Sequence, residues 1–215
     1  MSPRPHILTG LYAITDNNLI PKQRFIETVE LAIIGGAKII QYRDKSDDKK
    51  HRFEQAHALK QLCHHYQIPL LINDDIALAQ QVGAEGVHLG KEDVSLSTAR
   101  AVLGEKAIIG VSCYNQLPLA LKAIEAGATY VAYGRFFPSQ SKPNAIQANI
   151  ALLHQTRQQL HCPLVAIGGI TPDNGSELIK AGVNCLAVIQ GLFGQPDVKV
   201  VAQRYAQLFA YSHPK

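Results

Sequence analysis

The sequence contains no tryptophan, and only 7% of its 215 residues are aromatic. Because proteins that bind single-stranded nucleic acids stack the bases on aromatic side chains, this scarcity argues against that function. No run of about 18 apolar residues occurs, which excludes a transmembrane helix. The first ten residues, MSPRPHILTG, hold no apolar segment long enough for a secretion signal. We therefore expect a cytoplasmic protein with no membrane partner.

The chain also lacks a large excess of charge of one sign. Its 21 Lys and Arg residues and 17 Asp and Glu residues give a net charge of +4 at pH 7. A basic excess this small is too weak to indicate a nucleic-acid partner. It is compatible with small phosphorylated substrates.

Cysteine pairs and nucleophilic triads are missing as well. The four cysteines form no C-x-x-C pair, which excludes zinc-ribbon and thioredoxin-like proteins. We interpret all four as buried thiols. Cys113 has no histidine nearby in the sequence, so packing is favoured over a nucleophilic role. The sequence shows no obvious Ser-His-Asp or Cys-His set. The cysteines are Cys63, Cys113, Cys162 and Cys185.

What is present is a regular alternation of two patterns. Apolar residues make up 47% of the chain and charged residues 18%, which predicts a sizeable core. Short apolar runs rich in β-branched residues, typical of buried strands, alternate with amphipathic helical patterns. The strands are predicted at 10–15, 37–42, 68–72, 85–89, 107–111, 129–133, 163–167 and 183–189. The helices are predicted at 22–34, 47–66, 75–82, 95–103, 116–126, 147–160, 173–181 and 196–210.

Short motifs support these boundaries. Asp74, Ser95 and Thr171-Pro172 each precede a predicted helix and are residue types that favour a helix start. The segments GGAKIIQY, VGAEGVHL, AGATYVAY and AGVNCLAVI form a weak internal repeat, in which glycine ends a helix and a strand follows.

Eight strand–helix units in 215 residues give about 27 residues per unit. Strict alternation predicts a parallel sheet with right-handed crossovers. Eight units most simply close into a (β/α)₈ TIM barrel, so we predict a single compact domain over residues 1–215. An open doubly wound sheet is the alternative, but it usually has fewer units and a reversal in strand order.

In such a barrel the active site lies at the carboxyl ends of the strands. Gln41, Arg43 and Lys45 follow the second strand two residues apart, so they are expected to face the barrel mouth together and bind a polyanion. The alternative is a solvated, charge-rich strand end, since Asp47, Asp48, Lys49 and Lys50 come next.

Carboxylates follow the next two strands. Asn73-Asp74-Asp75 ends the third strand and Asp93 follows the fourth, so Asp74 and Asp93 are expected to converge. Two carboxylates with substrate phosphate oxygens are a usual Mg²⁺ site. The alternative is that Asp74 or Asp75 only caps a helix.

The later strands end in hydroxyls and glycines. Ser112 follows the fifth strand, and a long loop after the sixth carries Ser139, Gln140, Ser141 and Lys142. Long loops of this kind are often binding loops. Gly168-Gly169 and Ile189-Gln190-Gly191 end the last two strands, where this fold commonly binds phosphate. Two anion sites in one mouth favour an enzyme that joins two phosphorylated molecules.

With these residues in order, the sequence resembles thiamine phosphate synthases over about residues 10–193. The resemblance is carried by Gln41-x-Arg43-x-Lys45, Asn73-Asp74, Gly86-x-His88-x-Gly90-x-x-Asp93, Gly110-x-Ser112, Pro138-Ser139-x-Ser141-Lys142 and Gly168-Gly169-Ile170. It implies an Mg²⁺-dependent transferase that joins 4-amino-2-methyl-5-hydroxymethylpyrimidine diphosphate to 4-methyl-5-(2-phosphoethyl)thiazole, releasing pyrophosphate.

The resemblance also implies a role for each matching residue. Asp74 and Asp93 would bind Mg²⁺, and Arg43, Lys45, Ser112 and Lys142 would act on the leaving diphosphate. The pyrimidine diphosphate would be held by Gln41, Arg43, Lys45, Asn73, Ser112 and Lys142. The thiazole phosphate would be held by Ser139, Gln140, Ser141, Gly169, Ile189 and Gln190.

Departures from the family pattern leave two other functions open. The family loop usually has threonines where Ser139 and Ser141 stand, proline where Arg135 stands, and serine where Gln190 stands. A related thiazole tautomerase would bind only the thiazole phosphate, but its histidine after Gly-x-Ser is replaced here by Tyr114-Asn115. A non-catalytic ligand-binding barrel would not need both anion sites. Oligomeric state is left open, and a homo-oligomer is compatible with the sequence.

Overall fold

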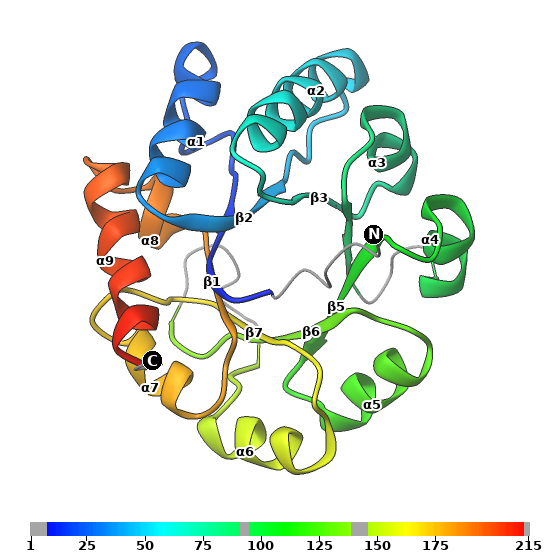
Figure 1. Cartoon of the computed structure of the whole chain (residues 1–215), viewed down its shortest axis with the longest axis vertical. Helices are drawn as coiled ribbons and strands as arrows, with labels where there is room; N and C mark the ends of the chain where they lie inside the picture. The colour runs from blue at the N-terminus through cyan, green and yellow to red at the C-terminus, as the bar shows by residue number, and fades with distance from the viewer. Residues whose placement is uncertain (1–7, 91–94, 139–145, 213–215) are drawn as a thin grey trace.

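The computed structural model describes residues 8–90, 95–138 and 146–212. Eight parallel strands close into a barrel in which each strand pairs with the next and β8 returns to β1. Figure 1 looks along this barrel and shows the helices as a ring around it. The predicted (β/α)₈ barrel is therefore confirmed, and the open sheet is excluded. The strands are β1 (Gly10–Ile14), β2 (Ala37–Tyr42), β3 (Leu70–Asn73), β4 (Gly86–Leu89), β5 (Ile108–Tyr114), β6 (Tyr130–Tyr133), β7 (Leu164–Ile167) and β8 (Cys185–Val188).

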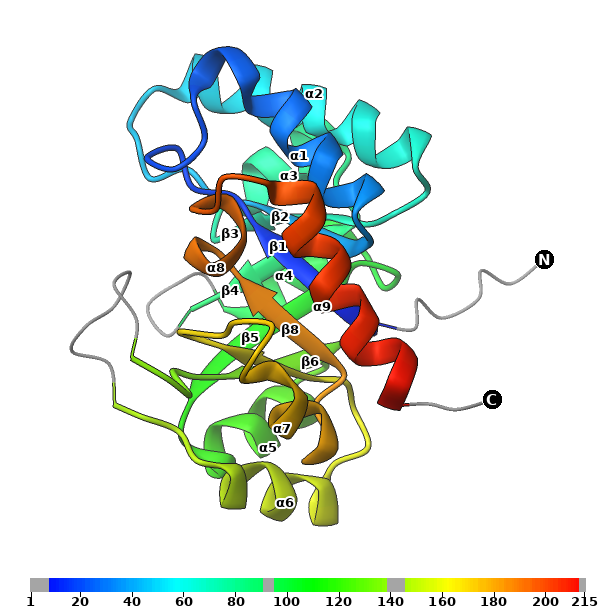
Figure 2. The same cartoon turned by 90° about the vertical axis from the view of Figure 1, so that its left-hand side faces the viewer.

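The helices in the described residues cover the outside of the barrel. They are α1 (Phe25–Ile34), α2 (Lys49–His65), α3 (Ile76–Val82), α4 (Leu96–Leu103), α5 (Leu117–Glu125), α6 (Ile150–Gln159), α7 (Gly175–Lys180), α8 (Gln190–Phe193) and α9 (Val198–Ser212), with a 3₁₀ turn at Lys22–Arg24 before α1. Figure 2 shows α9 running along the side of the barrel next to α1.

Strand residues alternate between two apolar cores. Leu11 and Ala13 pack outward against the helices, whereas Tyr12 and Ile14 belong to the smaller core inside the barrel. The same period of two runs through every strand, because successive side chains point to opposite faces. Side chains thus fill the barrel interior, and the residues near the carboxyl ends of the strands form its mouth.

Helix starts follow local capping chemistry, with two corrections. Ser95 caps α4 as predicted, accepting a hydrogen bond from the Thr98 amide. The side chain that caps α3 belongs to Asp75, because Asp74 adopts a left-handed conformation (φ 64°) outside the helix. The α7 helix begins at Gly175, so Thr171-Pro172 lies in the preceding turn and not in the first helical turn.

Two further differences from the sequence prediction lie at the strand ends. β5 extends to Tyr114, three residues past its predicted end, because Ser112 and Tyr114 continue the pairing with β6 around a bulge at Cys113. The short helix α8 follows β8, where no helix was predicted. A four-residue helix is too short to produce a periodic apolar pattern.

Helical glycine endings are as expected, and three of the four cysteines are buried as predicted. Gly36, Gly83, Gly127 and Gly182 all have positive φ where a helix gives way to a strand. All four thiols are free, and Cys162 alone of them is partly exposed. Within the described ranges, no helix is long and apolar enough to cross a membrane.

Candidate active site

A cavity of about 390 Å³ lies in the barrel mouth, at the carboxyl ends of the strands. Its walls differ in chemistry. Gln41, Asn73, His88 and Ser112, on the consecutive strands β2 to β5, form a polar side. The facing side, on β1 and β6 to β8, is apolar and is formed by Ile14, Ala132, Val165, Ile167 and Ala187. The cavity can therefore hold a polar, charged group beside an apolar ring.

Arg43 brings a cation to the polar side. Its backbone amide donates to the Thr15 hydroxyl (2.9 Å), and its Nη1 donates to Asp16 Oδ2 (3.0 Å). Both Arg43 and Asp16 are less than a quarter exposed, so the ion pair is partly shielded from water. The guanidinium is thereby held at the cavity wall, as the sequence predicted for Gln41 and Arg43.

Lys45 does not join them in this cavity. β2 ends at Tyr42, so the alternation that places Gln41 and Arg43 on one face is not maintained as far as Lys45. Lys45 lines a neighbouring open hollow of about 700 Å³, together with Asp74 and Arg52. Asn73 lines both spaces, which makes the hollow and the cavity adjacent parts of one mouth.

The hollow is the acidic part of the mouth. Asp44, Asp47, Asp74 and Asp75 all line it. The Asp75 carboxylate already has two partners, because it caps α3 and accepts from Arg52 Nη2 at 2.7 Å. The Asp74 carboxylate lies at the rim and accepts from the Asn73 amide. Among the described residues no cluster of three metal-binding side chains occurs. Mg²⁺ needs only one or two carboxylates when substrate oxygens supply other ligands, so Asp74 fits that ion.

Two glycine-containing turns close the other end of the cavity. Gly169 has φ 64°, and a Cβ there would lie 2.3 Å from the Pro138 carbonyl oxygen, so no larger residue fits. Ile189, Gln190 and Gly191 line the same end. The Gln190 side chain folds back toward Gly194, where a Cβ would be 2.3 Å from its amide nitrogen. The backbone of Gln190 is therefore better placed than its side chain to face a ligand.

Five side chains on the barrel floor form a continuous hydrogen-bonded chain. Gln41 Nε2 donates to Tyr12 Oη (2.6 Å), and Tyr12 Oη lies 2.9 Å from Tyr130 Oη. Tyr130 Oη lies 2.9 Å from His88 Nδ1, and His88 Nε2 lies 2.9 Å from Ser112 Oγ. The chain therefore links the polar wall of the cavity to the interior core.

Packing fixes the middle of this chain. The Tyr130 ring stacks on His88 with centroids 5.7 Å apart and meets Tyr12 edge-on at 6.1 Å. A Cβ at Gly110 would lie 1.9 Å from Tyr130 Cζ, so only glycine leaves room for this ring over β5. The glycine of the Gly110-x-Ser112 motif is therefore explained by the space that the Tyr130 ring needs.

Burial keeps these phenols neutral. Desolvation raises the pKa of both Tyr12 and Tyr130 well above the ordinary tyrosine value. Burial likewise raises the pKa of the Cys113 thiol to about 12. Cys113 is therefore protonated at neutral pH, which agrees with its interpretation as a packing residue and argues against a nucleophile.

The sequence predicted part of this constellation. Gln41, Arg43, Asn73, Ser112, Gly169, Ile189 and Gln190 line one cavity, and Lys45 and Asp74 line the adjoining hollow. Asp93, Ser139, Gln140, Ser141 and Lys142 lie outside the described residues. Sequence reasoning gave no role to Tyr12, Tyr130 and His88. Each is a polar side chain on the inward face of a strand, and His88 also belongs to the Gly86-x-His88-x-Gly90 motif.

Comparison with known proteins gives a consistent picture. The family model described as thiamine monophosphate synthase matches residues 11–192. A thiamine-phosphate synthase of Nitrosococcus oceani is 52% identical over 209 residues, which cover 97% of this chain and 96% of that protein. One of Alcanivorax borkumensis is 50% identical, covering 95% and 94%. The solved thiamine phosphate pyrophosphorylase of Pyrococcus furiosus has a TM-score of 0.87 at 33% identity, covering 97% and 98% of the two chains.

Proposed function

Since the chain belongs to the thiamine monophosphate synthase family, a family of transferases, we propose that it joins 4-amino-2-methyl-5-hydroxymethylpyrimidine diphosphate to 4-methyl-5-(2-phosphoethyl)thiazole. The products of the proposed reaction are thiamine phosphate and pyrophosphate. One observation carries the proposal. A single cavity is lined both by Gln41, Arg43 and Ser112, expected at the diphosphate substrate, and by Gly169 and Gln190, expected at the thiazole phosphate.

The proposed mechanism is dissociative. The bond between the pyrimidine methylene carbon and the diphosphate oxygen breaks first, and both bonding electrons leave with the diphosphate. The ring amino group stabilises the resulting methylene cation. The thiazole nitrogen then forms the new carbon–nitrogen bond. That nitrogen carries no proton, so the reaction needs no general base, and the absence of a Ser-His-Asp set from the sequence is no obstacle.

The chain's own residues then have two tasks, neutralising charge and positioning. Arg43, Lys45 and Lys142 would offset the charge on the leaving diphosphate, and Asn73 and Ser112 would donate hydrogen bonds to it. Gln41 would orient the pyrimidine. The glycine turn at Gly169, the backbone at Ile189 and Gln190, and the loop residues Ser139, Gln140 and Ser141 would hold the thiazole phosphate.

Magnesium is part of the proposal. Asp74 at the rim of the hollow, with Asp93, would hold the ion beside the diphosphate. When bound, Mg²⁺ supplies positive charge to a leaving group that would otherwise face two carboxylates.

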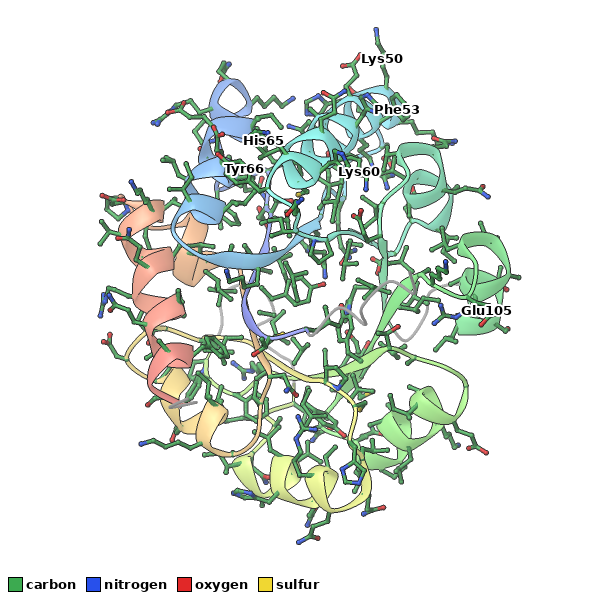
Figure 3. All side chains as sticks on the ribbon, in the orientation of Figure 1. Lys50, Phe53, Lys60, His65, Tyr66 and Glu105 are labelled. Atoms are coloured by element: carbon green, nitrogen blue, oxygen red, sulfur yellow. The ribbon has the colours of Figure 1, made fainter. Side chains whose placement is uncertain are left out.

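The direct test is incubation of the purified protein with both substrates and Mg²⁺, with thiamine phosphate and pyrophosphate quantified by mass spectrometry. We expect both products in equal amounts. A matched pair of variants localises the activity. Lys45→Ala, in the hollow, should lower kcat/KM about 100-fold. Lys50→Ala should leave it unchanged within about twofold, because Lys50 points away from the barrel at the start of α2 (Figure 3).

The outcome that contradicts the proposal is also defined. If no thiamine phosphate forms but the protein isomerises a thiazole carboxylate phosphate, it is a tautomerase and the diphosphate site is wrongly assigned. If neither reaction occurs and the thiazole phosphate still binds, the protein is a ligand-binding barrel.

A further inference from the structure

The hydrogen-bonded chain on the barrel floor has both of its ends in the cavity. Gln41 on β2 and Ser112 on β5 line the cavity, and they are connected through Tyr12 and His88, which also line it, and through the buried Tyr130. Tyr12 and Tyr130 are 118 positions apart in the sequence. Among the described residues, Tyr12 is the one hydrogen-bond partner of the Gln41 side chain, and His88 is the one partner of Ser112. Whether Gln41 and Ser112 each present a donor or an acceptor to a ligand is therefore set by the hydrogen-bonded side chains that connect them.

The direction of the chain follows from counting protons. The Gln41 amide nitrogen can only donate, so Tyr12 Oη accepts from it. Among the described residues, the single proton of Tyr12 then has its acceptor at Tyr130 Oη, and the proton of Tyr130 has its acceptor at His88 Nδ1. Since Nδ1 accepts in this arrangement, the ring proton lies on Nε2, which donates to Ser112 Oγ. In this direction every proton buried in the chain has an acceptor.

Burial makes the direction matter. The Tyr12 and Tyr130 side chains are 1% and 0% exposed, so water does not replace a lost partner. A buried hydroxyl proton without an acceptor costs about 1–3 kcal/mol. The raised pKa values of the two phenols mean that both keep their protons near neutral pH.

From this geometry we infer that Tyr12, Tyr130 and His88 are positioning residues that fix the hydrogen-bond polarity of the cavity. The Gln41 amide nitrogen is tied to Tyr12, which turns its Oε1 toward the ligand as an acceptor. Ser112 accepts from His88, which leaves its hydroxyl proton to donate to the ligand. The inference rests on the proposed function and deepens it. Gln41 selects a ring that carries an amino group, and Ser112 donates to an anionic leaving-group oxygen.

Binding selectivity tests the polarity without requiring turnover. The probes are 4-amino-5-hydroxymethyl-2-methylpyrimidine and its 4-oxo counterpart, with the dissociation constant of each measured by calorimetry. The wild-type protein should bind the amino compound at least about tenfold more tightly, because the oxo group would face the Gln41 carbonyl. In Tyr12→Phe the amide is free to rotate, so the ratio should fall below about threefold.

Tyr130→Phe tests the middle of the chain and keeps the ring that stacks on His88. The Tyr12 proton then loses its acceptor, so the binding ratio should fall as in Tyr12→Phe. The Ser112 proton is also no longer directed to the cavity, and kcat should fall about tenfold. The KM for the thiazole phosphate should stay within about twofold, because that substrate binds at the other end of the cavity.

Tyr133→Phe is the matched control. Tyr133 lies on the same strand as Tyr130 and is equally buried, but its hydroxyl meets Thr156 outside the barrel. This variant should keep the wild-type binding ratio and kcat while losing a comparable buried hydrogen bond. If Tyr130→Phe does not fold, Tyr12→Phe carries the test alone.

Two results would overturn the inference. The first is tighter binding of the oxo compound by the wild type, which would mean the opposite polarity. The second is an unchanged binding ratio in a folded Tyr12→Phe protein. An equal loss of affinity for both probes is one form of this second result and would indicate a merely structural role. A wild-type protein that makes no thiamine phosphate but shows the expected binding ratios would contradict only the proposed function.

Discussion

Asp74 and Asp75 are adjacent carboxylates with different surroundings. Asp75 accepts from the Leu78 amide at the start of α3 and from Arg52, so its charge supports the fold. Asp74 adopts a left-handed backbone conformation, which turns it out of the helix start and onto the rim of the hollow. Sequence reasoning assigned the metal role to Asp74 and left open which of the two caps the helix. The backbone conformation of a single residue separates them.

The different surroundings of Asp74 and Asp75 predict different effects when each is substituted. Asp75→Ala should lower the free energy of unfolding by about 1–2 kcal/mol through loss of the cap and the ion pair. Asp74→Asn should leave stability nearly unchanged, because asparagine tolerates the left-handed conformation. It should weaken Mg²⁺ binding in the presence of pyrophosphate at least about tenfold. Urea unfolding measures the free energy of unfolding, and calorimetry measures the Mg²⁺ affinity. Equal destabilisation by both variants, with Mg²⁺ affinity unchanged, would remove the metal assignment.

At the level of elements, single arginines on the outer helices hold the loops that lead into the strands. Arg157 on α6 donates to the carbonyl oxygens of Gly182 and Cys162 and to the Asn184 side chain. These acceptors immediately precede β7 and β8. One planar guanidinium thus joins a helix to the amino ends of two strands, far from the mouth at their carboxyl ends. Arg100 on α4 makes an equivalent set of bonds to Gly104, Glu105, Ala107 and Gly127.

Arg157→Lys should therefore weaken the fold and spare the chemistry. Lysine keeps the charge but cannot reach several carbonyls in a fixed plane, so the free energy of unfolding should fall by about 2 kcal/mol. The kcat of the proposed reaction should change less than about twofold. The control is Arg204→Lys, since Arg204 pairs with Asp173 on the surface and should cost under about 0.5 kcal/mol. If the activity of Arg157→Lys falls by more than its fraction of folded protein falls, Arg157 also affects catalysis and the prediction is wrong.

At the level of the whole molecule, the core holds thiols that ionise only with difficulty. Burial raises the pKa of Cys63 and of Cys113 to about 12 and also raises that of Cys185. In the unfolded chain a thiol ionises near pH 8.5. Below that pH the thiols are protonated in both states and stability is unaffected. As pH rises above it, the unfolded chain loses protons that the native protein keeps, so unfolding becomes favoured.

The free energy of unfolding should thus decline above about pH 8.5, by about 1.4 kcal/mol per pH unit for each such thiol. Urea unfolding at pH 7.5, 9 and 10 under reducing conditions measures the decline. Cys113→Ala should be less stable than the wild type at pH 7.5 and lose stability less steeply with pH. An identical slope in both proteins would mean that this thiol is not responsible.

The amino-acid sequence alone determined the architecture and most of the strand ends that carry the site. Short apolar runs, glycine-ended helices and eight successive strand–helix units can be recognised locally, so they predict the barrel before any long-range contact is known. Gln41 and Arg43 reached the cavity because they lie at or next to the end of a regular strand. The periodic argument failed at Lys45, where the strand had ended.

Only the tertiary structure decided which distant side chains meet. The chain from Gln41 through Tyr12, Tyr130 and His88 to Ser112 draws on five strands. Its members converge because the sheet closes and Gly110 leaves space for one ring. Likewise, only the folded structure shows that Asn73, at the end of β3, lines both the cavity and the hollow. Sequence periodicity states which face a side chain takes, but the distance across a closed barrel depends on strand register and packing, which no local pattern contains.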